Sequence, residues 1–361
     1  MSLALAGISA VTAVGDDAAS TFAALRANVA GLAEHPFHEL LPHDPEWDEA
    51  EPLRAGIVPT LSADLEGPTR LVGLALGALQ ALVRDAKLSR SELADCAFCM
   101  ALPELGPDTA PWDLARSFAT ELFAQAGVAP TRGVMVDQSG NTGAMVALHA
   151  AARCFAERRA QRCIVLAVDS FLDSARIADW DNRRRRFRSS RSRDGFLPGE
   201  AAVALLLEPA DAAARPGAAP APRPTLSMPG FGQESNPIEG ERAPDGKGLT
   251  DAIRRALAAL PDAVPRSVYA DHNGESHRSF EWGLAKSRLS PRLDEVELRH
   301  PADCIGDVGA ASGALLMGLA AHELGREGRR GRGVGLVLTA STSGHRAAVL
   351  VSPFEGREGS D

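Results

Sequence analysis

A glycine-opened helix followed by two apolar strands occurs twice along this chain, and the repeat limits the folds that the chain can adopt. The first copy starts at Gly140-Asn-Thr-Gly143-Ala144 and the second at Gly306-Asp-Val-Gly309-Ala310. Each start opens a run of small residues, and two runs rich in Val, Leu and Ala follow it. These runs are CIVLAVDS from Cys163 and AAVALLLE from Ala201, then VGLVLTAS from Val334 and AAVLVS from Ala347. The repeat predicts a chain of two similar halves.

The apolar runs alternate with helical segments, which predicts an α/β protein built in layers. Uninterrupted Val, Leu and Ile runs of about five to eight residues are typical of strands that are covered on both faces. Gly and Ala in the two glycine-opened helices permit close packing, so we expect these helices in a central layer. Further helices are predicted at 18–28, 71–85 and 248–260.

The segment 209–225 is composed mainly of Pro and Ala, a composition that neither continues a strand ladder nor fills a core. We interpret it as a surface connection between an N-terminal half, 1–208, and a C-terminal half, 226–361. The segment 171–199 has no counterpart in the second copy of the repeat. Inserted loops are where contacts with partners and substrates collect.

Composition and charge exclude several classes of protein. The 38 Lys and Arg against 47 Asp and Glu give a net charge of −9, which disfavours a general nucleic-acid binder. Five cysteines without framework spacing favour a reducing compartment. No apolar run approaches the roughly 18 residues that cross a bilayer, and the apolar start lacks the basic residues of a secretory signal. We therefore expect a cytoplasmic protein with no membrane contact.

Four strings resemble motifs of the β-ketoacyl-acyl-carrier-protein synthases, in that family's order and across nearly the whole chain. They are AGISAVTAVGDDAASTFAALRANVAGL near the start, VDQSGNTGA from Val136, DGFLPGEAAVALLLE from Asp194 and IGDVGAASG from Ile305. The second string resembles the family's nucleophile turn, V-D-T-A-C-S-T-G-A, and the last resembles I-G-H-x-x-A-A-A-G. The resemblance implies a thiolase-like fold, a five-layered α-β-α-β-α sandwich built from two similar halves. It also implies a dimer.

The family condenses an acyl thioester with a malonyl thioester and uses a cysteine nucleophile and two histidines. Counted from Asp137 or back from Gly143-Ala144, the cysteine position is occupied by Gly140, which has no side chain to acylate. The nearest hydroxyls belong to Ser139 and Thr142, and a hydroxyl needs a positioned base to become a useful nucleophile. Ser139 is also placed to cap the helix that follows.

The remaining catalytic positions of the family also depart from its pattern. The first histidine corresponds either to His272 or, when the shared glycine is aligned on Gly274, to Asp271. The second histidine is replaced by Asp307 and the lysine by Ala302. An aspartate carries the wrong charge to stabilise a developing oxyanion, and without a thiolate no acyl-enzyme forms.

The late glycine-rich loop of the family, G-F-G-G-H-N, corresponds to 341–346. Here the loop reads Ser-Thr-Ser-Gly-His-Arg, so the phenylalanine gate is lost while Gly344 and His345 are kept. The predicted substrate-binding residues are Thr142, Asn273, Ser343, Gly344 and His345.

The sequence favours a ketosynthase-like protein without condensing activity, a non-catalytic partner or acyl-binding subunit in fatty-acid-like or polyketide-like biosynthesis. The alternative is an acyltransferase or hydrolase of the same fold, with Ser139 as nucleophile and His272 as base. Asp307, Asp271 or Glu275 would then orient the base. In a third interpretation, His272, His277 and Glu275 only hydrogen-bond a turn around Asn273-Gly274.

Seven arginines lie between 182 and 193 in an otherwise acidic protein. Guanidinium groups suit the acidic helix of an acyl carrier protein or the phosphate of its pantetheine arm, and Arg184, Arg185 and Arg186 are the predicted contacts. Nucleic acid is a weaker candidate because no aromatic residues interleave with the patch in a recognised motif. Alternatively, the arginines belong to a loop in which they form salt bridges with Asp179, Asp181 and Asp194. The second subunit of the dimer is either a copy of this chain or an active ketosynthase.

No metal or nucleotide cofactor is expected. Cys96-Ala-Phe-Cys99 has the spacing of a metal-binding pair, but no second pair of Cys or His follows, and structural zinc takes four ligands. The segment is predicted to be a buried strand, whose alternation places the two thiols on opposite faces. No P-loop or G-x-G-x-x-G stands between a strand and a helix.

Overall fold

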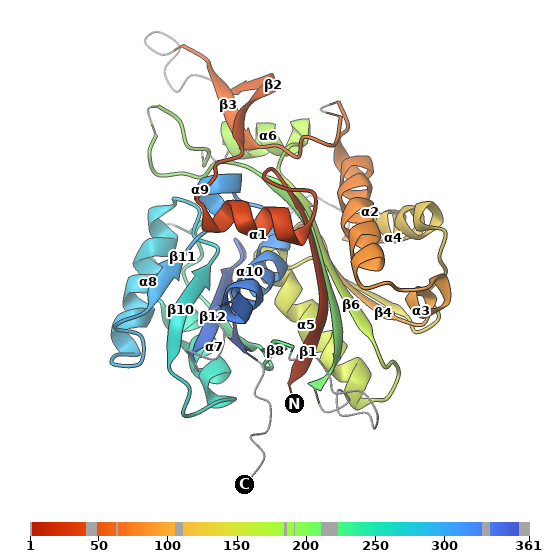
Figure 1. Ribbon diagram of the computed structural model, residues 1–361. Helices are drawn as coiled ribbons and strands as arrows, with labels where there is room; N and C mark the ends of the chain where they lie inside the picture. Colours follow the sequence, from red (N-terminus) through yellow and green to blue (C-terminus); the bar gives the residue numbers. More distant parts are fainter. Residues whose placement is uncertain are drawn as a thin grey trace.

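The apolar runs form the strands of one long sheet. The computed structural model describes residues 2–40, 49–62, 64–104, 111–183, 186–190, 192–210, 223–240, 242–326 and 333–353. In these residues an 11-stranded sheet runs in the order β11-β10-β12-β13-β8-β1-β7-β6-β4-β5, with β9 paired to β13 (Figure 1).

The sheet consists of two arrays joined by one short strand. The first array contains β1 (Leu3–Thr12), β7 (Glu200–Pro209), β6 (Cys163–Ser170), β4 (Ala97–Ala101) and β5 (Val134–Asp137). The second contains β11 (Glu297–Arg299), β10 (Pro265–Ala270), β12 (Val334–Ala340), β13 (His345–Ser352) and β9 (Gly230–Gln233). The strand β8 (Thr225–Leu226) pairs with β1 and with β13, so the two arrays form a continuous sheet. Of the predicted connection, residues 211–222 lie outside the described residues.

Alternation along the strands divides the core into layers. In β4, Cys99 faces an inner cluster with α5 (Gly143–Ala156) and α10 (Ser312–Arg326), whereas Phe98 and Met100 face an outer cluster. That outer cluster contains α2 (Gly67–Asp85) and α4 (Pro111–Ala126). On the other array, α7 (Lys247–Ala258) and α8 (Ser276–Arg288) cover the outer face. The predicted five-layered sandwich is confirmed.

The central helices pack as closely as their small residues allow. A Cβ built on Gly313 of α10 would lie 3.0 Å from the Cβ of Ala144 in α5. A larger side chain at this position would push the two helices apart, and interiors packed at crystal-like density resist such a shift. Next to α10 lies α1 (Ala18–Arg26), whose Phe22 belongs to the same inner cluster.

The predicted helices are present with shifted ends. The segment predicted at 71–85 begins four residues earlier, at Gly67, because Pro68 stands in the first turn, where its missing N–H is not needed. The other two correspond to α1 and α7. No described helix is long and apolar enough to cross a membrane.

The sequence repeat is real, but its register differs from the one that the glycine spacing suggests. A 3₁₀ turn, Gly140–Thr142, leads into α5, and a second, Gly309–Ala311, leads into α10. Gly140 therefore corresponds to Gly309, and both have positive φ, 58° and 49°. A Cβ on Gly309 would also lie 2.0 Å from the Asp169 carboxylate. The alignment of Gly140 with Gly306 was therefore wrong. It assumed that a glycine opens both central helices, whereas the first residue of α10 is Ser312.

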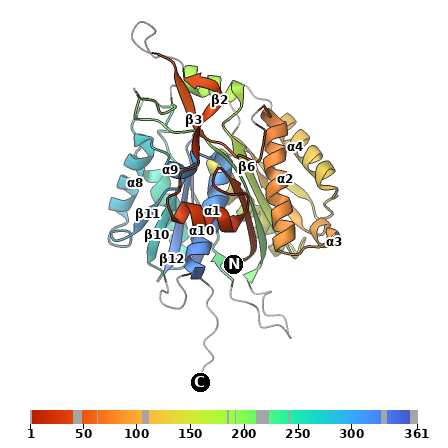
Figure 2. The same cartoon turned by 45° about the horizontal axis from the view of Figure 1, so that its top comes forward.

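The segment predicted as an inserted loop packs beside a separate hairpin at one end of the sandwich. The hairpin consists of β2 (Leu32–Leu40) and β3 (Glu51–Gly56), and the loop contains α6 (Ser174–Ala178) (Figures 1 and 2). Together they enclose a cluster of largely aromatic residues: Leu40, Leu53, Phe171, Ile177, Trp180, Phe187 and Phe196. The short helices α3 (Arg90–Ala94) and α9 (Ala302–Ile305) and the π-helical turn Asp179–Arg183 complete the described elements.

Candidate functional site

The turn between β5 and α5 has no room for a side chain at residue 140. Gly140 has φ 58°, a conformation that strains any residue other than glycine. A Cβ built there would lie 2.8 Å from the Cβ of Glu104 and 2.9 Å from its Oε2 atom. Both backbone conformation and space therefore select glycine where the resemblance places the nucleophile.

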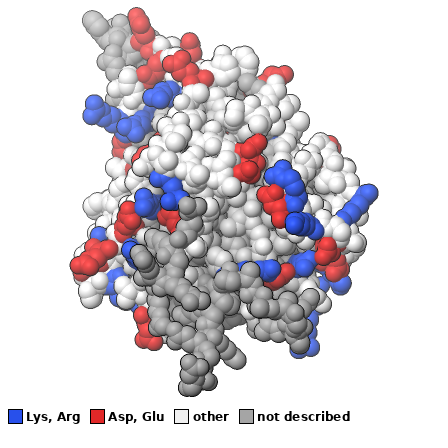
Figure 3. Space-filling view, in the orientation of Figure 1, with Lys and Arg blue, Asp and Glu red and all other residues white. Residues whose placement is uncertain are grey.

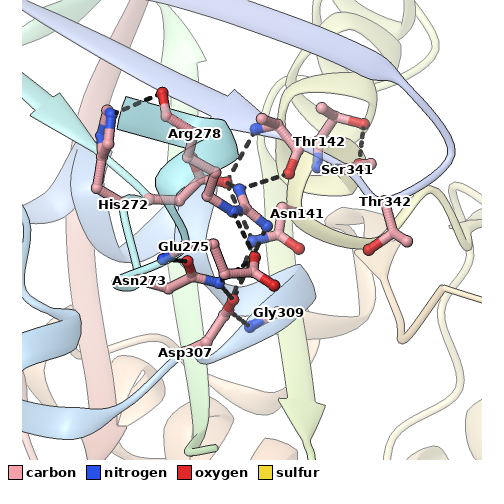
Figure 4. Close-up of polar contacts among 12 residues, drawn as sticks. Asn141, Thr142, His272, Asn273, Glu275, Arg278, Asp307, Gly309, Ser341 and Thr342 are labelled. Atoms are coloured by element: carbon pink, nitrogen blue, oxygen red, sulfur yellow. Dashed lines mark hydrogen bonds and ion pairs between the residues drawn. The ribbon is translucent and has the colours of Figure 1, made fainter. Parts of the chain in front are cut away.

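Beside this turn, Arg278 of α8 lies at the centre of a buried polar network (Figure 4). Its Nη1 atom donates to Asp271 Oδ2 at 3.0 Å and to the Ala340 carbonyl at 2.7 Å. Its Nε atom donates to Glu275 Oε2 at 3.3 Å, and its Nη2 atom lies 3.9 Å from Asp307 Oδ2. One guanidinium thus faces three carboxylates.

Two asparagines complete the network and connect it to the turn. The amide of Asn141 donates to Asp271 at 3.0 Å and lies 3.5 Å from Asp307. The amide of Asn273 donates to Asp307 at 2.7 Å and to Glu275 at 3.0 Å. Asp307 also accepts the backbone N–H of Gly309 at 2.8 Å. The structure therefore brings the predicted residues Asn273 and Asp307 together, and their side chains hydrogen-bond to each other.

The charges of the network oppose the effects of burial. Burial would lower the pKa of Arg278, yet the neighbouring Asp271, Asp307 and Glu275 raise it above its ordinary value. Burial also raises the pKa of Asp271, while the Arg278 charge acts to lower it. An arginine with this environment stays protonated and cannot act as a base. The carboxylates are occupied by its donors.

The serine and histidine of the alternative catalytic pair are held by other groups. The Ser139 hydroxyl donates to Asp137 Oδ2 at 3.2 Å, and the Ser139 carbonyl accepts from the Ser341 hydroxyl. His272 Nε2 lies 3.2 Å from the Arg278 carbonyl, and its buried Nδ1 has no partner among the described residues. Figure 4 places His272 on the far side of Arg278 from Thr142 and Ser341. No hydrogen bond joins Ser139 to His272 in the described part of the chain.

At the position that was ambiguous in the sequence, Asp271 faces the turn and His272 does not. Asp271 contacts Asn141. Burial, assisted by the Arg278 charge, lowers the pKa of His272 to about 4. The imidazole is therefore neutral at pH 7 and is part of the packing around α8.

The loop after β12, which carries the predicted substrate-binding residues Ser343, Gly344 and His345, meets the same turn through Ser341. The Thr142 N–H donates to the Ser341 hydroxyl at 3.0 Å, and the two hydroxyls lie 2.9 Å apart. Gly344 closes the loop with φ 95° and donates to the Ser341 carbonyl at 3.1 Å. The Ser343 N–H donates to Glu104 Oε1 at 3.0 Å, and His345 is exposed.

Three residues of the site were not singled out from the sequence: Glu104, Asn141 and Arg278. Glu104 lies three residues beyond the end of the buried strand β4. Polar residues just beyond the carboxyl ends of neighbouring parallel strands gather at one edge of a sheet, and this rule identifies Glu104 as a candidate. Nothing in the pattern of the α8 sequence distinguishes Arg278 from a surface arginine.

No protein-family model matches this sequence, and no curated protein does. Solved structures do match. A chain of the AntDE:AntF complex, a type II polyketide synthase acyl carrier protein with its ketosynthase bound to the hexaketide, aligns over 98% of this chain and 99% of its own length. The identity is 15% and the TM-score 0.77. The chain has a ketosynthase fold.

Two further structures with the ketosynthase fold match over nearly all of this chain. The ishigamide ketosynthase/chain length factor covers 98% of it and aligns over 99% of its own length, at 15% identity and a TM-score of 0.73. The ketosynthase from module 6 of the bacillaene synthase of Bacillus subtilis 168 covers 99% and aligns over 73% of its own length, at 12% identity and a TM-score of 0.74. The low identities restrict the likeness to the fold.

On this ketosynthase fold the described arginines of the run differ in burial, because Arg186 is largely buried whereas Arg188 and Arg193 are exposed. Arg186 Nε donates to Glu275 at 2.6 Å, the side chain is 12% exposed, and the guanidinium stacks 4.6 Å from the Trp180 ring centre. Arg186 thus links the inserted loop to the network, and its contact with a carrier protein stays a prediction. Arg184 and Arg185 lie outside the described residues. Among the described residues on the face in Figure 3, basic and acidic side chains are interspersed.

The described residues contain no group of three or more His, Cys, Asp or Glu side chains that could hold a metal ion. Cys96 and Cys99 face opposite sides of the sheet, in the outer and inner clusters respectively. All five cysteines are buried and free. The cysteine pair is part of the core.

Proposed function

We propose that this chain is a ketosynthase-like subunit without condensing activity, which acts beside an active ketosynthase or binds acyl groups on a carrier protein. One observation carries the proposal. The turn at Gly140 excludes a nucleophilic side chain, and the Arg278 network occupies the surroundings in which a base would be needed. Interactions that a transition state requires are then missing at several positions at once, and such losses are not compensated by the remaining groups.

An exposed sheet edge supports assembly with a second subunit. In the described residues β5 ends the sheet and pairs only with β4. Its Val134 is 42% exposed. The free N–H and C=O groups of an edge strand are a template for pairing with another chain. We propose that β5 of this chain meets the same strand of its partner, either a copy of this chain or an active ketosynthase.

The alternative acyltransferase or hydrolase lacks a supporting contact. Ser139 is bonded to Asp137, whose pKa burial raises, and His272 faces the Arg278 carbonyl. A serine nucleophile needs a base within hydrogen-bond reach, directly or through one water. We therefore do not assign a reaction to this pair.

Native mass spectrometry with an acyl carrier protein tests the proposal. The carrier protein is supplied unloaded, acyl-loaded and malonyl-loaded, and a ketosynthase with its cysteine serves as control. We expect a non-covalent complex in which the acyl group stays on the carrier protein. Transfer of the acyl group to this chain, release of the free acid, or no complex with any form of the carrier protein or with a ketosynthase would contradict the proposal.

A further inference from the structure

Three cysteines meet where the C-terminal end of α5 packs on β4 and β6. Cys99 lies in β4, Cys163 is the first residue of β6, and Cys154 lies in the last turn of α5. All three belong to the inner cluster. Thr142 caps the other end of α5, which at 1.5 Å per residue is about 18 Å away along the helix axis. The thiols are therefore outside the site at the turn after β5.

The register of the two strands places Cys99 and Cys163 on the same face of the sheet but not opposite each other. Cys99 is paired with Val165 and Cys163 with Ala97, so the two cysteines are diagonal neighbours. Diagonal neighbours in a sheet lie about 7–8 Å apart, whereas a disulfide joins Cα atoms about 4.4–6.8 Å apart. A direct bond between the two strand cysteines is disfavoured.

The thiol of Cys154 contacts both strand cysteines from the helix. It hydrogen-bonds with the thiols of Cys99 and Cys163. The Cys163 thiol also donates to the Ala151 carbonyl at 3.9 Å, so part of its hydrogen-bonding capacity is already used within the core. Cys154 and Cys99 are therefore the pair that is free to react with each other.

The environment of Cys154 favours its ionised form. The hydrogen bond with Cys99, assisted by the Arg159 charge, lowers the pKa of Cys154 below its ordinary value, although burial acts to raise it. The same hydrogen bond raises the pKa of Cys99, so the proton stays on the strand cysteine. The thiolate is the nucleophilic form of cysteine. Cys154 is also 7% exposed, against 1% for Cys99, so a small molecule from solvent meets Cys154 first.

We propose that Cys154 is an oxidation site for hydrogen peroxide and that Cys99 converts the oxidised residue into a disulfide. The Cys154 thiolate attacks one peroxide oxygen, the O–O bond breaks, and the second oxygen leaves as water after it takes up two protons, one from the peroxide and one from solvent. Cys154 is then a sulfenic acid. The Cys99 sulfur attacks the Cys154 sulfur, the S–S bond forms, and the sulfenic hydroxyl leaves as water with the Cys99 proton.

The two sulfurs lose two electrons, which reduce one peroxide to two waters. The new bond fastens α5, the helix that follows the Gly140 turn, to the strand β4. The inference goes beyond the proposed function and does not rest on it.

Peroxide treatment of the folded, unmodified chain tests the proposal. The protein is then denatured, its remaining thiols are alkylated, and its peptides are mapped by mass spectrometry. One disulfide consumes two thiols, so the five free cysteines should fall to three, and a peptide that joins Cys99 to Cys154 should appear. A reductant should restore all five thiols.

Cys304 serves as the control within the same molecule. It is 6% exposed, nearly as much as Cys154, but burial raises the pKa of its thiol. We expect Cys154 to be oxidised about tenfold faster than Cys304. Equal rates for the two residues, or a disulfide that joins Cys154 to a cysteine other than Cys99, would overturn the inference.

A substitution tests the role of the second thiol. In Cys99→Ala the sulfenic acid at Cys154 loses its partner and should be trapped there by dimedone. Cys96→Ala is the matched control, because Cys96 is also buried beside β4 but belongs to the outer cluster, and this variant should form the disulfide. Absence of the dimedone adduct in Cys99→Ala would contradict the proposal. If this variant does not fold, the measurement on the unmodified chain decides. No carrier protein is used, so failure here is distinct from failure of the proposed function.

Discussion

Arg278 Nη1 lies 3.0 Å from Asp271 Oδ2, and both side chains are buried. Asp271 is one of the two residues at which the resemblance places the family's first histidine. Removal of one partner of a buried ion pair leaves an uncompensated charge, and here Asp307 faces the same guanidinium, whereas Glu275 is also paired with Arg186.

We expect Arg278→Met to lower the free energy of unfolding by about 3–5 kcal/mol, because it leaves the buried carboxylates of Asp271 and Asp307 without their cation. Urea unfolding measures the change. Arg254→Met is the control, since the Arg254–Asp251 pair is exposed and should contribute less than about 1 kcal/mol. Equal losses in the two variants would show that the network does not stabilise the fold.

The buried His272 should make stability depend on pH. Its pKa is lowered from 6.5 to about 4 in the folded chain, so between these values the unfolded chain binds the proton and the folded chain does not. Stability contributed by the neutral imidazole is present above pH 6.5 and is lost as the pH falls towards 4. We expect the unmodified chain to lose about 2 kcal/mol more than His272→Gln between pH 7 and pH 5.

The exposed His345 provides the control for this pH dependence. The variant His345→Gln should keep the slope of the unmodified chain when unfolding free energies are measured at both pH values. A slope in His272→Gln as steep as in the other two proteins would mean that His272 is protonated in the fold.

The glycine at residue 140 should not accept a cysteine without cost. We expect Gly140→Cys to lower the free energy of unfolding by about 1–3 kcal/mol, because φ is 58° and Glu104 occupies the space of the new Cβ. Gly283→Cys in α8 is the matched control, since a Cβ there meets nothing within 4 Å. The free energies of unfolding of both variants are measured in urea. Equal values would contradict the claim that this turn excludes a side chain.

The edge strand β5 should carry the subunit contact. We expect Val134→Lys to weaken self-association or association with a ketosynthase, because a charge on an edge strand opposes pairing with a second strand. Sedimentation velocity measures this. Val264→Lys is the control, since Val264 is 62% exposed outside any strand. Association that is unchanged in Val134→Lys would place the contact elsewhere.

Much of the fold follows from local sequence. Uninterrupted apolar runs identified β6, β7, β12 and β13, and Gly with Ala identified the central helices. The register of the repeat did not follow, because Ser312 opens α10 where a glycine was expected. Positive φ at Gly309 became visible only with the backbone in view.

The site was less predictable because its contacts join segments far apart in the sequence. Asn141 and Asp271 are 130 residues apart, and Glu104 and Thr342 are 238 apart. The resemblance indicated which residues stand at the positions of the family's cysteine and histidines, but not which groups these residues contact. The run of arginines likewise gave no sign that Arg186 stacks on Trp180 and pairs with Glu275, which is 89 residues away.

The most direct test of the account is intact-protein mass spectrometry after exposure to acyl- and malonyl-loaded carrier protein and coenzyme A. A ketosynthase with its catalytic cysteine is treated in parallel and must become acylated. The account predicts that the mass of this chain does not change, because Gly140 offers no nucleophile and Ser139 is held by Asp137. A stoichiometric acyl adduct mapped to Ser139 or Thr142 would contradict it.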